Sequence, residues 1–358
     1  MDTKTHHFFT KTEDAWEAML AACKEARVSI DLEQYIFTND DVGRQFIEIF
    51  IQKIKEGVKV RLICDTVGSY YFYNSSIPQT LRAAGIEIRF FNIISPWRIH
   101  NCFSWYFRDH RKILIVDGKT AFVGGVGIRE SMRSWRDTNV MVTGRIIEEI
   151  QKTFNEMWIL VAEKNIFARI RRSRQQHKKI NFVTNSPYPR RRFLYHQFIE
   201  AIRSSKKYVY LTTPYFVPNQ KLLRTLTNAV RRGVDVRVVV PKTSDTVLVN
   251  RASHSFFYEL LDSGVRIYQY PKDFIHAKTA IVDDTWSTIG SFNFDNLSFL
   301  YNHEANIVSM DRVFTKILKD QFLTDTEHSE EVTLNEWEKR PILWKLREFM
   351  VLPIRRFL

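Results

Sequence analysis

Hydrophobic and polar positions in the first half of the chain follow two patterns, which predict helices and strands in alternation. Residues 15–26 and 42–56 carry apolar side chains three or four positions apart, the spacing of an amphipathic helix. Short apolar runs bounded by glycine or polar residues predict buried strands. These runs lie at residues 28–37, 57–65, 84–91 and 110–117. The order is typical of an α/β unit with a largely buried sheet.

The second half of the chain repeats this order. Helical spacing returns at residues 198–203 and 221–232. The strand-like runs return at residues 208–217, 233–241, 263–270 and 276–283. A repeated order of this length indicates internal duplication. We therefore predict an α/β fold of two similar lobes, each a mixed β-sheet flanked by helices, packed with pseudo-twofold symmetry.

Four segments follow from the duplication. Residues 1–170 form the first repeat, residues 171–185 a basic and polar linker, and residues 186–325 the second repeat. Residues 326–358 form a C-terminal extension that mixes bulky apolar side chains with basic ones. This extension is expected either to lie in a lipid headgroup layer as an interfacial helix or to dock on the protein body.

One motif, His-x-Lys-x4-Asp, occupies the last matched strand of each repeat. Its histidines are His110 and His276, and its lysines are Lys112 and Lys278. Side chains two residues apart in a strand point to the same face, about 7 Å apart along the backbone. Each motif therefore places an imidazole beside an ammonium group. If the duplicated lobes bring both pairs together, one pocket holds two histidines and two lysines.

Such a pocket suits the transfer of a phosphodiester. One imidazole attacks phosphorus and forms a phosphohistidine, while the other protonates the leaving alkoxide and then deprotonates an incoming alcohol or water. The lysines hold the non-bridging oxygens and balance the charge that develops in the transition state. Because the lysines supply the positive charge, we predict neither a metal nor a cofactor.

The carboxylates near these motifs divide into two groups. Asp117 and Asp283, the motif aspartates, have the opposite strand parity to their histidines, so we expect structural roles for them. Asp137 and Glu304 each follow a motif aspartate by about twenty residues. A carboxylate bonded to one ring nitrogen fixes the histidine tautomer and stabilises the imidazolium. We therefore predict that Asp137 and Glu304 orient the catalytic histidines.

At these residues the chain resembles the phospholipase D superfamily, which is defined by paired motifs of this kind and a following glycine-rich step. It is most similar to the cardiolipin synthase branch. The stretches that carry the branch resemblance are residues 33–37, 135–138, 213–218 and 290–295, together with Ser298. The resemblance implies a bilobal fold with one active site between the repeats. It also implies transfer of a phosphatidyl group from one phospholipid to the hydroxyl of a polar lipid or glycerol.

The resemblance further implies a role for each site residue. His110 is the implied nucleophile and His276 the acid–base partner, although the symmetry of the repeats allows the reverse. Lys112, Lys278 and Asn293 are implied to hold the phosphoryl group. The first repeat departs from the family pattern, because Gly127 stands at the position that matches Asn293. Loss of that donor costs a few kcal/mol of transition-state stabilisation where nothing replaces it.

The charge balance narrows the class of partner. The 358-residue chain has 53 Lys and Arg against 40 Asp and Glu, a formal net charge of +13. This surplus favours phosphate-bearing substrates, nucleic acid or an anionic membrane surface. Three cysteines, Cys23, Cys64 and Cys102, are too few for a disulfide framework. No stretch approaches the roughly 20 apolar residues of a spanning helix. We expect a cytoplasmic protein, peripheral on the cytoplasmic face of a membrane.

Two aromatic clusters bear on the choice of substrate. They lie at residues 70–73 and 96–107, and each fits a membrane interface, base stacking or core packing. We predict a phosphatidyltransferase that acts on an anionic phospholipid, phosphatidylglycerol or a similar lipid, at a membrane surface. The alternative is a phospholipase D hydrolase or a nuclease of the same superfamily, and only this alternative has nucleic acid as a partner.

Overall fold

The computed structural model describes residues 6–93, 105–162, 179–271 and 274–341, together with Trp344, Val351 and Arg355. The chain divides into two compact units. The first comprises Met1–Phe182 and Asn302–Ala305, and the second comprises Val183–Tyr301 and Asn306–Leu358. Four residues that belong to the second repeat in sequence are thus part of the first unit.

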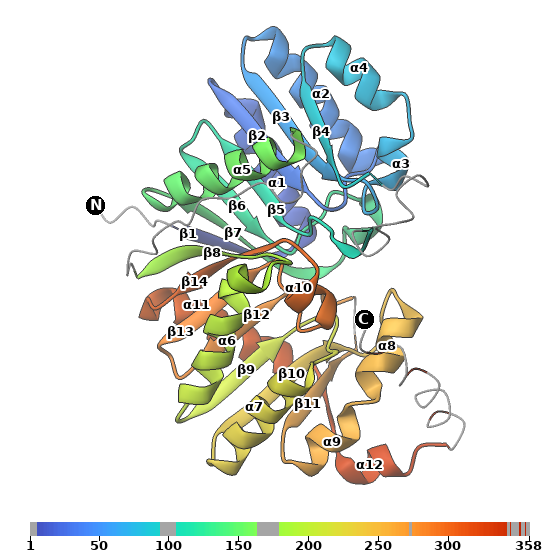
Figure 1. The fold of residues 1–358 in the computed structure, drawn as a ribbon, viewed down its shortest axis with the longest axis vertical. Coiled ribbons are helices and arrows are strands. Elements are labelled where there is room, and N and C mark those ends of the chain that lie inside the picture. Colours follow the sequence, from blue (N-terminus) through green and yellow to red (C-terminus); the bar gives the residue numbers. More distant parts are fainter. Residues whose placement is uncertain are drawn as a thin grey trace. The chain divides into compact units, whose positions relative to one another are not determined.

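The first unit is a mixed seven-stranded sheet in the order β1-β7-β6-β5-β2-β3-β4 (Figure 1). The parallel pairs are β2–β3 and β3–β4, and the other neighbours are antiparallel. The strands are β1 (His6–Lys11), β2 (Ser29–Gln34), β3 (Lys59–Asp65), β4 (Glu87–Phe91), β5 (Lys112–Val116), β6 (Thr120–Gly124) and β7 (Arg136–Thr143). The helices are α1 (Thr12–Glu25), α2 (Asp41–Lys55), α3 (Tyr70–Tyr73), α4 (Ile77–Ala83) and α5 (Ile146–Ala162).

The second unit is a mixed eight-stranded sheet in the order β15-β11-β10-β9-β12-β13-β14-β8. Its strands are β8 (Ile180–Asn185), β9 (Tyr208–Thr212), β10 (Asp235–Pro241), β11 (Arg266–Tyr270), β12 (Thr279–Val282), β13 (Trp286–Gly290), β14 (Glu304–Ser309) and β15 (Glu330–Val332). Its helices are α6 (Phe193–Ser204), α7 (Gln220–Arg231), α8 (Val247–His254), α9 (Phe257–Asp262), α10 (Asn296–Leu300), α11 (Arg312–Glu327) and α12 (Leu334–Glu338). The order β14-β13-β12-β9-β10-β11 matches β7-β6-β5-β2-β3-β4, which confirms the predicted pair of similar α/β lobes.

The alternation of side chains along β3 shows why the first sheet is covered on both faces. Val60 and Leu62 point into a core shared with α1 and α2. Arg61, between them, points to the opposite face and lies 4.9 Å from the ring centroid of Phe154 on α5. There it forms two 2.6 Å hydrogen bonds to Asp31 of β2. A charge at this position is tolerated because its donors are paired and its guanidinium stacks on an aromatic ring.

The segments outside the two repeats are only partly described. Residues 163–178, which include most of the predicted linker, lie outside the described residues, while 180–185 form β8. In the predicted extension, β15 pairs with β11, and the ring of Trp337 on α12 lies 4.7 Å from that of Phe257 on α9. This part of the extension docks on the second unit.

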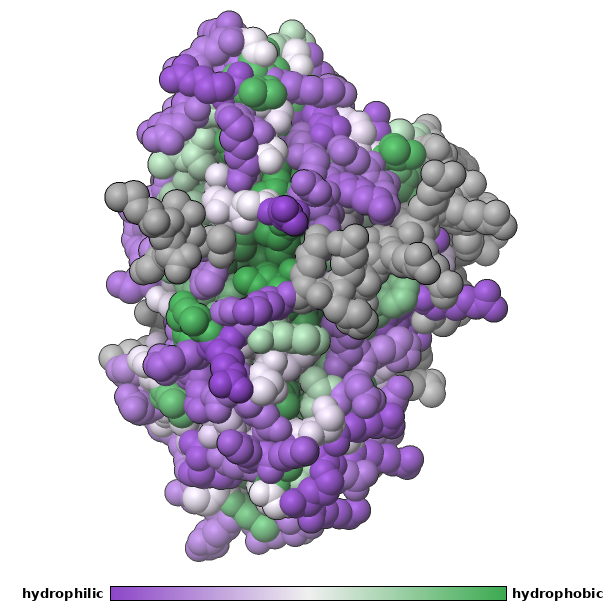
Figure 2. Space-filling model, turned by 90° about the vertical axis from the view of Figure 1, so that its left-hand side faces the viewer, coloured by the Kyte–Doolittle hydropathy of each residue, from purple (hydrophilic) through white to green (hydrophobic). Residues whose placement is uncertain are grey.

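Figure 2 shows one face of the molecule, on which hydrophilic residues predominate and hydrophobic residues are exposed in groups between them. Most large apolar side chains in the described residues are buried in the cores of the two units. Within the described ranges, no helix has both the length and the apolar character that crossing a bilayer requires.

Candidate active site

The first motif lies where β5 begins, beside a segment that comes from the second repeat. Lys112 opens β5 and pairs with Gln34 of β2. The backbone N–H of His110 donates to the carbonyl of His303 at 3.0 Å, and the N–H of His303 donates to the carbonyl of Arg108 at 2.8 Å. These two bonds form a short parallel bridge. They hold residues 302–305 against the motif within the first unit.

Glu304 contacts the imidazole of His110 directly. Its two carboxylate oxygens lie 3.0 and 3.1 Å from Nδ1 of His110. Glu304 is fully buried, and the ring of Tyr35 meets the imidazole edge-on at 4.8 Å. A carboxylate at Nδ1 favours the tautomer that carries the proton there, so that Nε2 keeps its lone pair. The dyad therefore presents a nucleophilic nitrogen or, after protonation, a stabilised imidazolium.

Both motif lysines adopt the same local arrangement. Lys112 donates from Nζ to the carbonyl of His110 at 2.6 Å, and Lys278 donates to the carbonyl of His276 at 2.5 Å. All four side chains are at least nine-tenths buried. The ammonium of Lys112 also lies 5.2 Å from the ring centroid of Tyr35. In each unit a buried cation is thus held against the backbone of its motif histidine.

Asn293 and Gly127, which match in sequence, have different surroundings. The Asn293 side chain is buried, and its Oδ1 has no hydrogen-bond partner in the described part of the chain. At Gly127, a Cβ would lie 3.1 Å from Sδ of Met132. The Gly127 carbonyl accepts a 2.8 Å hydrogen bond from the indole of Trp16. The space beside Gly127 is therefore used for packing, whereas the amide of Asn293 retains unused hydrogen-bonding capacity.

Asp137 is placed by a close approach of two strands. It is buried on β7, and its Oδ1 accepts a 2.7 Å hydrogen bond from the N–H of Thr138. A Cβ at Gly125 would come within 2.3 Å of that oxygen. Glycine is therefore required at position 125 for this carboxylate to keep its position. Glu304, the other predicted orienting carboxylate, contacts His110, while the orienting role of Asp137 stays a prediction.

The motif aspartates hold backbone at the other end of the strands. Asp117 accepts hydrogen bonds from the N–H groups of Arg27, Val28 and Ser29 at 2.7–3.1 Å. Asp283 does the same for the N–H groups of residues 206–208 at 2.6–2.9 Å. Both aspartates have left-handed backbone conformations, with φ of 54° and 52°. Each carboxylate fixes the turn that leads into a central strand, β2 or β9, and so positions the sheet.

The chain matches the family described as "Cardiolipin synthase, PLD-like domain" over residues 19–158 and 198–326. The chain belongs to this family. It is a phospholipase D-type phosphodiester transferase. Cardiolipin synthase A of Pseudomonas putida is 34% identical over 333 residues, which cover 90% of this chain and 69% of that protein. Cardiolipin synthase of Geobacillus kaustophilus is 31% identical, with 95% and 69% covered.

The fold is also that of a solved structure. The crystal structure of phosphatidylserine synthase from Haemophilus influenzae superposes with a TM-score of 0.76 at 14% identity. It covers all of this chain, and the chain covers 96% of it. At this identity the likeness supports the fold alone. It agrees with the cardiolipin synthase family in assigning two phospholipase D-like lobes to the chain.

Replacing the first motif aspartate tests its anchoring role in this cardiolipin synthase-family chain. Asp117→Ala is expected to lower the free energy of unfolding by about 2–4 kcal/mol, because three backbone N–H groups lose a charged acceptor. Asp117→Asn is expected to cost less, since asparagine tolerates the left-handed conformation and keeps one acceptor oxygen. Urea denaturation of both variants measures the difference. Equal stability of Asp117→Ala and the native protein would contradict the role.

A buried ionic network lies beside the first motif, and the sequence patterns did not predict it. Arg111 lies between the motif histidine and lysine and so points to the other face. There it reaches Glu33 of β2 at 2.5 Å and Asp109 at 3.1 Å. Burial raises the pKa of Glu33 well above its usual value, although Arg111 opposes the shift. A charged residue within the strand-like run 28–37 could have indicated this network. At the corresponding positions the second repeat has Ala277 and Ile275, so this network is specific to the first unit.

A second ion pair secures the approach to His110. Arg108 lies 3.3 Å from the carboxylate of Asp65, which also accepts a 3.0 Å hydrogen bond from the N–H of Asp109. Burial raises the pKa of Asp65 to about 6, while Arg108 and three backbone N–H groups act in the opposite direction. The pair ties the carboxyl end of β3 to the segment that leads into the motif. It therefore positions the chain on which His110 sits.

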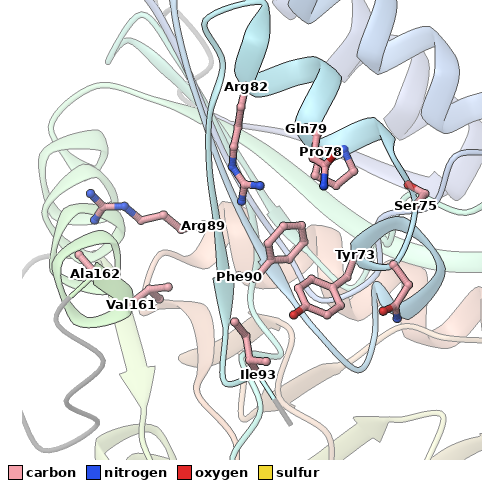
Figure 3. Close-up of a pocket in the computed structure, with 11 residues that line it drawn as sticks. Tyr73, Ser75, Pro78, Gln79, Arg82, Arg89, Phe90, Ile93, Val161 and Ala162 are labelled. Carbon is pink, nitrogen blue, oxygen red and sulfur yellow. The ribbon is translucent and has the colours of Figure 1, made fainter. Parts of the chain in front are cut away.

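A cavity of about 610 Å³ opens at the edge strand β4 of the first unit. Figure 3 shows Arg82 reaching from α4 toward Phe90, with Tyr73 beside that ring and Ile93 below it. Arg89 points the other way, toward the end of α5. The cavity lies near the carboxyl end of β4, which is the end of the strands at which Lys112 begins β5. Its walls are cationic and aromatic, and it lies at the end of the strands where the motif lies.

The first aromatic cluster, residues 70–73, has a divided role. Phe72 is fully buried in the core, and Tyr73 lines the cavity. Tyr70 and Tyr71 are 59% and 78% exposed. Most of the second cluster, residues 96–104, lies outside the described residues. Exposed tyrosines next to a cationic cavity suit a membrane interface, since their rings are amphipathic.

Proposed function

We propose that the chain transfers a phosphatidyl group from a phospholipid to an alcohol acceptor through a phosphohistidine intermediate. The observation that carries this proposal is the buried dyad of His110 and Glu304, with the ammonium of Lys112 hydrogen-bonded to the His110 carbonyl. The dyad supplies a nitrogen nucleophile whose second nitrogen is held by a carboxylate. The lysine supplies a cation for a non-bridging oxygen. Together these are the two requirements for attack on a phosphodiester.

The proposed reaction proceeds in two steps at one phosphorus atom. In the first, Nε2 of His110 forms a bond to phosphorus, the bond to the leaving alcohol breaks, and His276 gives that alcohol its proton. In the second, His276 takes the proton of the acceptor hydroxyl, whose oxygen displaces His110. Lys112, Lys278 and Asn293 hold the phosphoryl oxygens in both steps. The mechanism requires both histidines to act on the same substrate.

The proposed substrate is an anionic phospholipid such as phosphatidylglycerol, with a second lipid or glycerol as acceptor. The relatives are named cardiolipin synthases, and the structural neighbour is a phosphatidylserine synthase, so phospholipid is the substrate class they share. The net charge of +13 favours an anionic surface. We place the protein on the cytoplasmic face of a membrane, with the exposed Tyr70 and Tyr71 in the headgroup layer.

Incubation with labelled phosphatidylglycerol vesicles in the presence of a chelator tests the substrate class. We expect a new phospholipid with a second phosphatidyl group, a phosphatidyl alcohol when an alcohol other than glycerol is added, and phosphatidic acid where water intercepts the intermediate. Product analysis by chromatography measures the three outcomes. Cleavage of single-stranded DNA without any lipid product would overturn the proposal in favour of a nuclease. Phosphatidic acid as the sole product at every acceptor concentration would make the chain a hydrolase.

A further inference from the structure

A second cavity, in the second unit, is lined by cationic and neutral polar residues. It has a volume of about 490 Å³ and lies between α6 and α7, which are side by side in Figure 1. Four of its seven lining residues are cationic: Arg203, Lys221, Arg224 and Arg232. The other three are Gln220, Thr225 and Asn228. No carboxylate lines this α6–α7 groove, and none of its residues belongs to either histidine motif.

The four cations make no ion pair with any carboxylate in the described ranges of the chain. Arg232 instead donates to the carbonyl of Ile202 at 3.0 Å and to Oγ of Ser205 at 3.2 Å. Lys221 lies 5.4 Å from the ring centroid of Tyr195. No carboxylate of the described residues therefore compensates the positive charges that line the groove.

The sequence of α7 shows that this is not an ordinary solvated helix face. Helix α11 pairs Lys316 with Asp320 one turn away at 2.6 Å, which is how an exposed face usually balances its charge. Helix α7 contains no aspartate or glutamate, and its polar face carries Lys221 and Arg224 one turn apart. Like charges at this spacing destabilise a helix. The pKa of the neighbouring His196 is lowered mainly by burial, and also by Lys221 and Arg192. The contribution of these two cations is what a positive field at the groove would produce.

We propose that the α6–α7 groove binds the phosphate of an anionic phospholipid headgroup, at a site separate from the histidine motifs. Guanidinium and ammonium groups are the donors that phosphate prefers. The amides of Gln220 and Asn228 beside them suit the hydroxyls of a glycerol headgroup. No aromatic side chain lines the groove, so it lacks the platforms on which single-stranded nucleic acid stacks. Its volume fits one headgroup. The site binds lipid independently of whether the motifs transfer phosphatidyl groups.

Vesicle binding by the full-length protein tests the site. The variant Lys221→Gln with Arg224→Gln removes two cations from the groove. The matched control, Arg312→Gln with Lys316→Gln, removes two exposed cations from α11 of the same unit. We expect the groove variant to bind phosphatidylglycerol vesicles about 30-fold more weakly than the native protein, since each basic residue near an anionic surface contributes about fivefold. The control is expected to stay within about threefold, and circular dichroism verifies that both variants fold. A second groove variant, Arg203→Gln with Arg224→Gln, is expected to show the same loss.

Soluble probes distinguish the sources of phosphate. sn-Glycerol 3-phosphate and a single-stranded oligonucleotide are titrated against the same proteins by calorimetry. If the groove variant and the control lose vesicle binding equally, the loss is explained by net charge alone, and the proposed site is contradicted. Unchanged vesicle binding in the groove variant would overturn it too, whether or not binding of glycerol phosphate or DNA is lost. All of these experiments measure binding, so their outcome does not depend on whether the protein transfers phosphatidyl groups.

Discussion

Replacing either motif histidine with alanine is expected to reduce the rate of phosphatidyl transfer by about 10,000-fold or more, because the nucleophile and the acid–base group each lack a substitute. His110 and His276 are both buried beside a lysine, and the proposed reaction uses both in each step. The double variant is expected to be no slower than the slower single variant, since residues that act as a unit are not additive. His7→Gln, at an exposed position on β1, is the control.

An activated substrate separates the two roles. A phosphatidyl ester of p-nitrophenol releases a leaving group that needs no protonation, so the variant without the acid retains the first step. We expect His276→Ala to release nitrophenol in a burst and to accumulate a phosphoenzyme labelled at His110. His110→Ala is expected to show neither. Peptide mapping of the trapped phosphohistidine measures this. A label on His276 in the His110→Ala protein would reverse the roles, and no label in either variant would contradict a covalent intermediate.

The repeated elements were predictable because local pattern decides them. Alternating apolar residues in the runs 57–65 and 233–241 give β3 and β10, and the three-to-four spacing gives α2 and α7. The pairing of histidine with lysine on one strand face follows from a period of two. The opposite parity of Asp117 and Asp283 was also readable, and the structure places their carboxylates on backbone N–H groups at the far ends of the strands.

Contacts between distant residues were not predictable in the same way. Glu304 was a candidate to orient a histidine, but its partner lies 194 residues away in the other repeat. No local pattern records that residues 302–305 belong to the first unit. The pairing of Arg111 with Glu33 has the same character, because it depends on β5 lying next to β2. Sequence spacing thus identifies which residue types are available, and the sheet order decides which of them meet.

Removing the charge of Glu304 tests whether this pairing matters for catalysis. Glu304→Gln is expected to lower kcat by about 100-fold to 10,000-fold with little change in KM, because the imidazolium of His110 loses its counter-charge and the favoured tautomer is no longer fixed. Shape and burial are nearly conserved, so the loss is electrostatic. Rates measured with natural and activated substrates show which step is slowed.

Two further readouts distinguish an orienting role for Glu304 from a merely structural one. Nitrogen NMR of labelled histidine is expected to show the proton of His110 on Nδ1 in the native protein and a shift toward Nε2 in Glu304→Gln. The acidic limb of the rate against pH is expected to move to lower pH as well, because the nucleophile must be unprotonated and the carboxylate stabilises the protonated ring. Glu33→Gln is the matched control, since it removes another buried carboxylate of the same unit that is paired with Arg111 rather than with His110. If Glu33→Gln and Glu304→Gln lost activity only in proportion to unfolded protein, with an unchanged His110 tautomer, Glu304 would be a packing residue and the dyad would have no catalytic meaning.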